Sequence, residues 1–223
     1  MGTLYLVRHG QASLGAANYD CLSPLGQQQS QRLGAYWAAR GLGFDAVLIG
    51  GLQRHAQTWA GIAQGLGAAQ PQATVWPGLN EYDSDAVVHS VQPGADTRPR
   101  TPEAARTHFR VLRQGLLQWA QGTRTPAGMP PYADFAQGVR AVLDHVRTQC
   151  HGKVLLVSSG GPIATAVALT LQAPPESFVE LNLRLRNTAL TELVFKPSGL
   201  ALHSFNHLPH LDGAAYADWI SYA

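Results

Sequence analysis

Three short polar segments of this chain combine side chains and backbone groups of the types that phosphate sites use. The first is Arg8-His9-Gly10-Gln11, the second runs from Gly50-Gly51 to Arg54, and the third is Ser158-Ser159-Gly160-Gly161. Guanidinium groups form paired hydrogen bonds with phosphate oxygens, and glycines let backbone N–H groups approach an anion closely. Together the three segments predict an anion-binding site.

A histidine within such a site can act as a nucleophile. Neutral imidazole attacks phosphorus, and the neighbouring charges of Arg8 and Arg54 favour the uncharged ring near neutral pH. We therefore expect His9 to form a phosphohistidine. The departing oxygen then needs a proton and water must later be activated, and Glu81 is the best candidate for this acid and base, with Asp83 as the alternative.

Three apolar runs of strand type end just before the three polar segments. They are Leu4 to Val7, Asp45 to Ile49 and Val154 to Val157. In an open α/β sheet, ligands bind beyond the carboxyl ends of parallel strands, where loops from separate strand–helix units meet. These strands would therefore bring the three polar segments to one edge of a mostly parallel sheet.

A segment whose apolar residues recur at helical spacing follows each of these strands. Ser23-Pro24 provides an N-cap and a first-turn proline, and the expected helices run over 24–41, 54–66 and 163–171. Near the end, apolar runs over 189–195 and 200–205 flank the turn Lys196-Pro197-Ser198-Gly199, which predicts a hairpin at the sheet edge.

The chain length and the strand–helix alternation predict one domain over residues 1–223. We expect a three-layer α/β/α fold with a mostly parallel central sheet. Residues 83–131 interrupt the alternation with a polar stretch (92–100), a helix over 102–121 that Thr101 caps, and a proline-rich break (126–131). We interpret this region as an insertion that covers the site.

Composition excludes several classes of function. The chain is 45% hydrophobic and 13% charged, and its arginines are dispersed, so neither a membrane span nor a nucleic-acid surface is indicated. Two cysteines, Cys21 and Cys150, are too few for a disulfide scaffold or a cysteine-based zinc site. The first residues lack signal-peptide features, which favours a cytoplasmic location. We expect no metal, no cofactor and a small phosphorylated substrate as the partner.

Four motifs give a resemblance to a known family. LYLVRHGQAS (4–13), NYDCLSPLG (18–26), LQRHAQT (52–58) and LNEYD (79–83) resemble segments of the histidine phosphatase superfamily, also called the phosphoglycerate mutase-like family, in the family's order and over nearly the whole chain. The resemblance implies that Arg8 and Arg54 bind phosphate, that His9 is the nucleophile and that Glu81 is the proton donor. Gln11 would add a hydrogen bond.

The third segment departs from the family pattern. The family usually reads Ser-His-Gly-Gly where this chain has serine at position 159. Loss of one well-placed donor costs about 10²–10³ in rate, so we expect phosphate binding through Ser159 and the Gly160 N–H but slower turnover. An alternative role for Ser159 is to cap the following helix. His55, His207 and His210 are the alternatives for supplying the missing imidazole.

Three functions are compatible with these residues. The first is phosphomonoester hydrolysis through a phosphohistidine on His9, with reduced activity. The second is a non-catalytic protein that binds phosphate or a phosphorylated metabolite, and it is motivated by Ser159. A phosphoglycerate mutase is less favoured, because Gln11-Ala12-Ser13 follows the signature in place of the Trp-Asn that is typical of the mutases.

Overall fold

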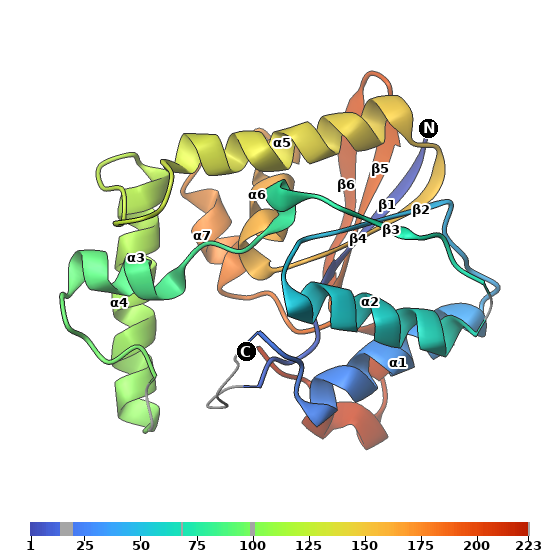
Figure 1. Cartoon of the computed structure of the whole chain (residues 1–223), viewed down its shortest axis with the longest axis horizontal. Coiled ribbons are helices and arrows are strands. Elements are labelled where there is room, and N and C mark those ends of the chain that lie inside the picture. The colour runs from blue at the N-terminus through green and yellow to red at the C-terminus, as the bar shows by residue number, and fades with distance from the viewer. Residues whose placement is uncertain (14–19, 68, 99–100, 223) are drawn as a thin grey trace.

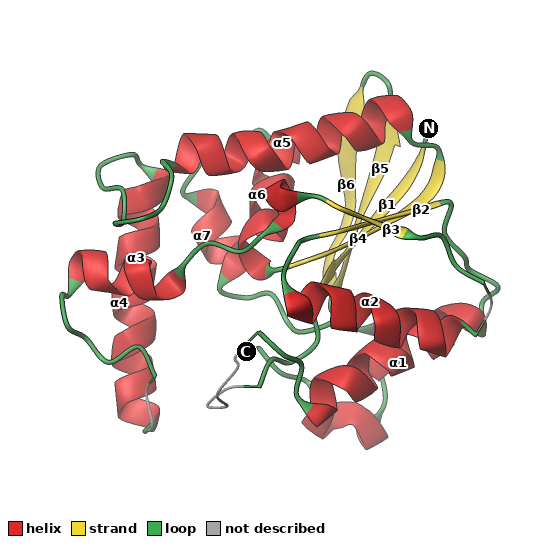
Figure 2. Ribbon diagram, viewed as in Figure 1, coloured by secondary structure: helices red, strands yellow, loops and turns green. Residues whose placement is uncertain are grey.

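A computed structural model describes residues 1–13, 20–67, 69–98 and 101–222 of the chain. A central sheet separates two layers of helices, with α1 (Pro24–Ala38) and α2 (Gln53–Leu66) on one face and α5 (Tyr132–Gln149) and α6 (Gly160–Thr170) on the other (Figures 1 and 2). This three-layer arrangement confirms the predicted fold class.

Among the described residues, the sheet has six strands in the order β3-β2-β4-β1-β5-β6. Their bounds are β1 Gly2–Arg8, β2 Ala46–Ile49, β3 Ala73–Val75, β4 Gly152–Ser158, β5 Leu190–Lys196 and β6 Gly199–His207. The first four strands pair in parallel, whereas β5 is antiparallel to β1, and β6 is antiparallel to β5 at the sheet edge. The predicted hairpin is therefore confirmed. The short strand β3 was not predicted.

Two apolar clusters hold the layers together. On one face, side chains of β1 and β4 pack against α5 and α6, with Leu6, Leu156 and Val142 among the fully buried residues. On the other face, Leu155 packs with residues of α1 and α2 such as Trp37. β4 is buried on both faces, as expected for a central parallel strand.

Local signals explain where the first helices begin and end. The Ser23 hydroxyl accepts a hydrogen bond from the Gly26 N–H at 3.0 Å, so it caps α1 as predicted. α2 ends at Leu66, and the C-cap residue Gly67 has a left-handed φ of 73° that suits glycine. The structure corrects the start of α6, which begins at Gly160 and not at Ile163. Pro162 is tolerated there because a first-turn N–H has no partner within the helix.

In the described part of the region from 83 to 131, two helices lie to one side of the sheet (Figure 1). α4 (Pro102–Ala120) was predicted, and its Thr101 cap accepts from the Ala104 N–H at 3.2 Å. α3 (Ser84–Val91) was not predicted. It is capped by the Asp83 carboxylate, which accepts from two backbone N–H groups. Asp83, the alternative acid, is therefore engaged as a helix cap.

The remaining helices were not predicted from the sequence. Where the structure describes the chain, these are α5, α7 (Ser177–Asn182) and three short 3₁₀ turns at Pro77–Leu79, Pro209–Leu211 and Ala214–Trp219. Across the described part of the chain, no helix combines the length and the apolar character needed to cross a bilayer.

Candidate functional site

The carboxyl ends of β1, β2 and β4 lie side by side and bring the three polar segments together. Arg8 is in register with Ser158, and Ile49 is in register with Val157. Backbone hydrogen bonds continue past the strand ends, from the His9 N–H to the Ser158 carbonyl at 2.8 Å and from the Gly50 N–H to the Val157 carbonyl at 3.1 Å. Sheet pairing therefore sets the distances between the segments.

His9 is held by its backbone and by its ring. Nδ1 lies 2.7 Å from the Gly10 carbonyl oxygen, so in the neutral ring Nδ1 carries the proton and Nε2 keeps its lone pair. The His9 carbonyl accepts from the Asn187 side chain at 3.1 Å, and the next N–H, that of Gly10, donates to the Thr58 hydroxyl at 3.0 Å. This geometry keeps the lone pair of the neutral ring on Nε2.

The surroundings of His9 keep its ring uncharged. Burial lowers its pKa well below the usual 6.5, and the charges of Arg8 and Arg54 lower it further, whereas the bond to Gly10 acts weakly in the opposite direction. Only 3% of the residue is exposed. Near neutral pH His9 is therefore a neutral imidazole.

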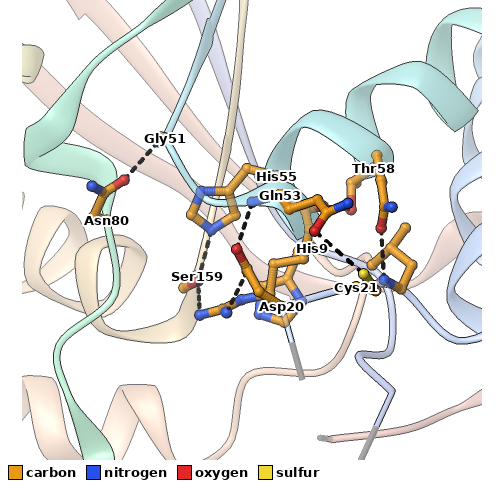
Figure 3. Close-up of polar contacts among 12 residues, drawn as sticks. His9, Asp20, Cys21, Gly51, Gln53, His55, Thr58, Asn80 and Ser159 are labelled. Carbon is orange, nitrogen blue, oxygen red and sulfur yellow. Dashed lines mark hydrogen bonds and ion pairs between the residues drawn. The ribbon is translucent and has the colours of Figure 1, made fainter. Parts of the chain in front are cut away.

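Two arginines from different elements lie beside His9. Arg8, at the end of β1, is half-buried and donates to the carbonyl of Leu185. Arg54, in the first turn of α2, is buried and forms an ion pair with Asp20 at 2.8 Å. The other oxygen of Asp20 accepts from the Gln53 N–H at the start of α2 (Figure 3). Asp20 thus occupies a position where an anion meets both a guanidinium and a helix N-terminus.

Glu81 lies in the loop before α3 and faces the start of α6. Its two carboxyl oxygens are 3.1 and 3.3 Å from the donating Gly161 N–H. Burial raises the pKa of Glu81, and this effect outweighs the opposing effects of Arg54, Gly161 and Arg8. A Cβ on Gly161 would lie 2.3 Å from a Glu81 oxygen, so a larger residue there would displace the carboxyl group from this position.

Gln11 and Gly160 lie close to the three segments, each with a neighbour of its own. The Gln11 side-chain oxygen accepts from the Ser23 hydroxyl at 2.8 Å, which links the first segment to the cap of α1. Gly160 begins α6, and a Cβ there would lie 2.3 Å from the side-chain oxygen of Asn182. The phosphate contacts expected of both residues stay predictions.

Ser159 lies at the N-cap position of α6, but its side chain makes no capping bond. Its hydroxyl lies 2.7 Å from His55 Nε2 and 3.5 Å from Arg54 Nη2, which donates to it (Figure 3). The capping alternative is therefore wrong in this structure. The serine instead belongs to a buried polar group that includes Arg54.

Among the three alternative histidines, His55 lies at Ser159. His210 is buried elsewhere, 3.0 Å from the Thr188 hydroxyl, and His207 is exposed at the end of β6. The rings of His9 and His55 have centroids 5.8 Å apart. Its place directly after Arg54 in the first helical turn was the available signal for His55.

Sequence reasoning missed Asp20, Thr58 and Asn187 as neighbours of the site. Asp20 and Thr58 fall within the motifs over 18–26 and 52–58, so the resemblance contained a signal for them. Asn187 follows no motif and is brought to the His9 carbonyl by the fold alone. Within the described ranges, no group of three or more His, Cys, Asp or Glu side chains is arranged to hold a metal ion.

Known proteins similar to this chain include phosphatases. The mitochondrial serine/threonine-protein phosphatase PGAM5 of Mus musculus is 26% identical over 198 residues, and that of Homo sapiens is equally similar. The match covers 88% of this chain but only 59% of the mouse protein, so the chain spans well under two thirds of that relative. The cytoplasmic location of this chain stays a prediction.

Solved structures share the fold. A phosphoserine phosphatase variant from Entamoeba histolytica, in complex with phosphoserine, matches with a TM-score of 0.66 and 20% identity over 95% of this chain and all of that one. The mycobacterial glucosyl-3-phosphoglycerate phosphatase matches with a TM-score of 0.64 and 21% identity over 92% of this chain and 99% of that one. At these identities the likeness is evidence for the fold.

The family follows from the extent of the sequence match. The model of the histidine phosphatase superfamily (branch 1) matches residues 4–208, from β1 to beyond the edge hairpin. This range includes each of the three polar segments and Glu81. The chain therefore belongs to the histidine phosphatase superfamily.

Proposed function

We propose that this protein hydrolyses phosphomonoesters of small molecules through a phosphohistidine on His9. The observation that carries the proposal is the geometry of His9, whose Nδ1 is tied to the Gly10 carbonyl while its neutral ring lies beside two arginines. A nucleophile with an available lone pair and cations for the phosphoryl charge are the two requirements of the first chemical step.

In the first step, His9 Nε2 attacks phosphorus and a nitrogen–phosphorus bond forms. The bond from phosphorus to the ester oxygen breaks, and that oxygen takes a proton from the Glu81 carboxyl group as the alcohol leaves. Burial raises the Glu81 pKa, which favours the protonated form needed here. Arg8 and Arg54 stabilise the charge on the other phosphoryl oxygens.

In the second step, Glu81 acts as the base. Its carboxylate accepts a proton from water while the water oxygen attacks phosphorus, and the nitrogen–phosphorus bond breaks. Inorganic phosphate leaves, and His9 and Glu81 return to their starting states. One acid–base group can serve both steps because the proton that it gives in the first is recovered in the second. No metal or cofactor takes part in this scheme.

The remaining site residues would bind the phosphoryl group or shape access to it. The Gly160 N–H lies at the start of α6, where the helix dipole favours an anion, and Gln11 lies beside His9 in the chain. In this proposal the whole chain forms one domain, and residues 83–131 line the mouth of the site. A small phosphorylated substrate agrees with the phosphoserine bound to the similar amoebal enzyme.

Ser159 favours a second candidate function. A chain with serine at this position, where the family pattern has histidine, would bind phosphate and turn it over slowly or not at all. In that case the protein binds a phosphorylated metabolite without catalysis. Phosphoglycerate mutase activity remains the third candidate and predicts transfer between positions of the substrate rather than release of phosphate.

Labelling of His9 tests the proposal. Purified protein is mixed with a ³²P-labelled phosphomonoester and quenched in alkali, which preserves phosphohistidine, and released phosphate is followed in parallel. We expect label on the wild type, none on His9→Ala, and release of inorganic phosphate by the wild type alone.

Absence of both label and turnover on a broad panel of phosphoesters would refute the hydrolase. If inorganic phosphate still raised the melting temperature, the binding protein would be the correct function. Movement of label between positions of phosphoglycerate, without release, would instead identify a mutase.

A further inference from the structure

His55 is a buried titratable residue that the proposed reaction does not use. It is 0% exposed and lies in the first turn of α2, directly after Arg54. Burial and then the charge of Arg54 lower its pKa to about 3, so the ring is neutral at physiological pH. An imidazole with no exposed surface has no access to a bound phosphate, so any role that it has must pass through a neighbour.

The neighbour is Ser159, which connects His55 to a phosphate ligand. The serine hydroxyl is also 0% exposed, and it lies 2.7 Å from His55 Nε2 and 3.5 Å from Arg54 Nη2. A guanidinium group only donates hydrogen bonds, so the serine oxygen is the acceptor in its contact with Arg54. The shorter hydrogen bond of the Ser159 hydroxyl, which is the one to His55, therefore sets the direction in which this hydroxyl points.

The backbone around His55 leaves a space that fits the imidazole. A Cβ on Gly50 would lie 2.2 Å from His55 Nδ1, so only glycine at position 50 admits the ring in this orientation. Gly50 follows β2, His55 lies in the first turn of α2 and Ser159 precedes α6. The space for the His55 ring, and its link through Ser159 to Arg54, therefore depend on residues from three elements.

We infer that His55 is a positioning residue: it fixes the hydroxyl of Ser159, which in turn fixes the guanidinium of Arg54 for phosphate. This inference rests on the proposed function only in taking Arg54 as a phosphate ligand. Affinity for phosphate then depends on an imidazole that never contacts it, and the serine acts together with His55.

The test measures binding of inorganic phosphate by calorimetry, which requires no turnover. The variants are His55→Leu, His55→Gln, Ser159→Ala and the double variant His55→Leu/Ser159→Ala. Leucine and glutamine both approximate the size of the ring, but only glutamine can hydrogen-bond to Ser159. The matched control is His210→Leu, a second buried histidine that also bonds to a hydroxyl group.

We expect His55→Leu and Ser159→Ala each to weaken phosphate binding about tenfold, the effect of one hydrogen bond to a network that holds a charged group. The double variant should be no weaker than either single variant, because both substitutions break the same chain of contacts. His55→Gln should stay within about threefold of wild type, and His210→Leu should bind phosphate like wild type.

Several results would overturn the inference: wild-type binding by His55→Leu, losses that add in the double variant, or an equal loss in His210→Leu. Should the leucine variant fail to fold, His55→Gln and Ser159→Ala still decide the matter, since equal binding by these two would exclude positioning through the serine hydroxyl. Failure of the proposed function is seen separately, as absent label on His9 with phosphate binding intact.

Discussion

Glu81 gains its expected chemistry from its surroundings. The carboxyl group accepts from the backbone N–H of Gly161 and lies near both arginines, and each of these contacts favours the charged form. Burial opposes them and has the larger effect, so the pKa of Glu81 is raised. The result is an acid that keeps its proton to a higher pH than an ordinary glutamate does.

The role of Glu81 can be tested by the choice of leaving group. Glu81→Gln retains the size of the side chain but cannot donate a proton. We expect it to slow release of phosphate from phosphoserine, whose alkoxide leaves poorly, by about 10²–10⁴. With p-nitrophenyl phosphate, whose phenolate leaves without a proton, the loss in the phosphorylation step should be much smaller. Equal losses with both substrates in a single-turnover measurement would exclude Glu81 as the proton donor.

The two neighbouring histidines show how environment separates residues of the same type. His9 and His55 are both buried and both have lowered pKa values. His9 Nδ1 is tied to a backbone carbonyl, which leaves Nε2 for chemistry, whereas His55 Nε2 is occupied by the Ser159 hydroxyl. Hydrogen bonding to the ring nitrogens therefore differs between the two imidazoles in the way that the proposed roles of attack and support require.

At the scale of elements, two helix N-termini meet at the site. α2 supplies Arg54 and His55 in its first turn, and Ser159 precedes α6. Parallel pairing of β2 with β4 places these helix starts beside each other. The backbone N–H groups at both ends are unpaired within their helices, which adds positive potential to that of the arginines.

Because the starts of α2 and α6 lie together, the effect of placing the family's histidine at position 159 can be predicted. Ser159→His would place a second imidazole where His55 already lies 2.7 Å from the serine oxygen. We expect this overfilling to lower the free energy of unfolding by about 1–3 kcal/mol in urea titrations. His55→Ala/Ser159→His should recover most of that loss, because the removed ring makes room for the new one.

The stability of the Ser159→His variant also tests whether residue 159 and His55 occupy one shared space. A single variant as stable as wild type would show that position 159 has space for a ring beside His55. The two residues would then not share one space, and the double variant would gain nothing from the removal of His55.

At the scale of the whole molecule, buried histidines make stability depend on pH. His55 and His210 both have a pKa of about 3 in the folded chain, chiefly because they are buried, against an ordinary value of 6.5. Between these values the unfolded chain binds one more proton than the folded chain at each residue. The destabilisation that these two residues cause therefore begins below pH 6.5 and grows as the pH falls towards 3.

The expected change of the free energy of unfolding with pH is large enough to measure. Each of these two histidines should remove up to about 1.4 kcal/mol of unfolding free energy per pH unit, and the lowered pKa of His9 adds an effect of the same sign. Urea titrations at pH 7, 6 and 5 measure the total. His210→Leu should reduce the slope of the unfolding free energy between pH 6 and 5 by about the contribution of one histidine. A slope unchanged by this substitution would mean that His210 is protonated in the folded state.

Much of the fold could be predicted because its signals are local. The run from Leu4 to Val7, the Ser23-Pro24 cap and the hairpin turn over 196–199 each follow from residues next to one another. α3, α5 and β3 were missed for physical reasons. α3 depends on a single acidic cap, α5 follows a proline break without a capping side chain, and β3 has three residues of which two are exposed.

The sequence by itself determined His9, Arg8, Arg54 and Glu81 as the candidates for chemistry, because their types and motifs are readable along the chain. Tertiary structure decided how Ser159 is used. Its partner His55 is 104 residues away, and only the parallel pairing of β2 with β4 brings the two to 2.7 Å. A hydrogen bond depends on distance and direction in space, and for residues so far apart along the chain both are set by the packed sheet and helices.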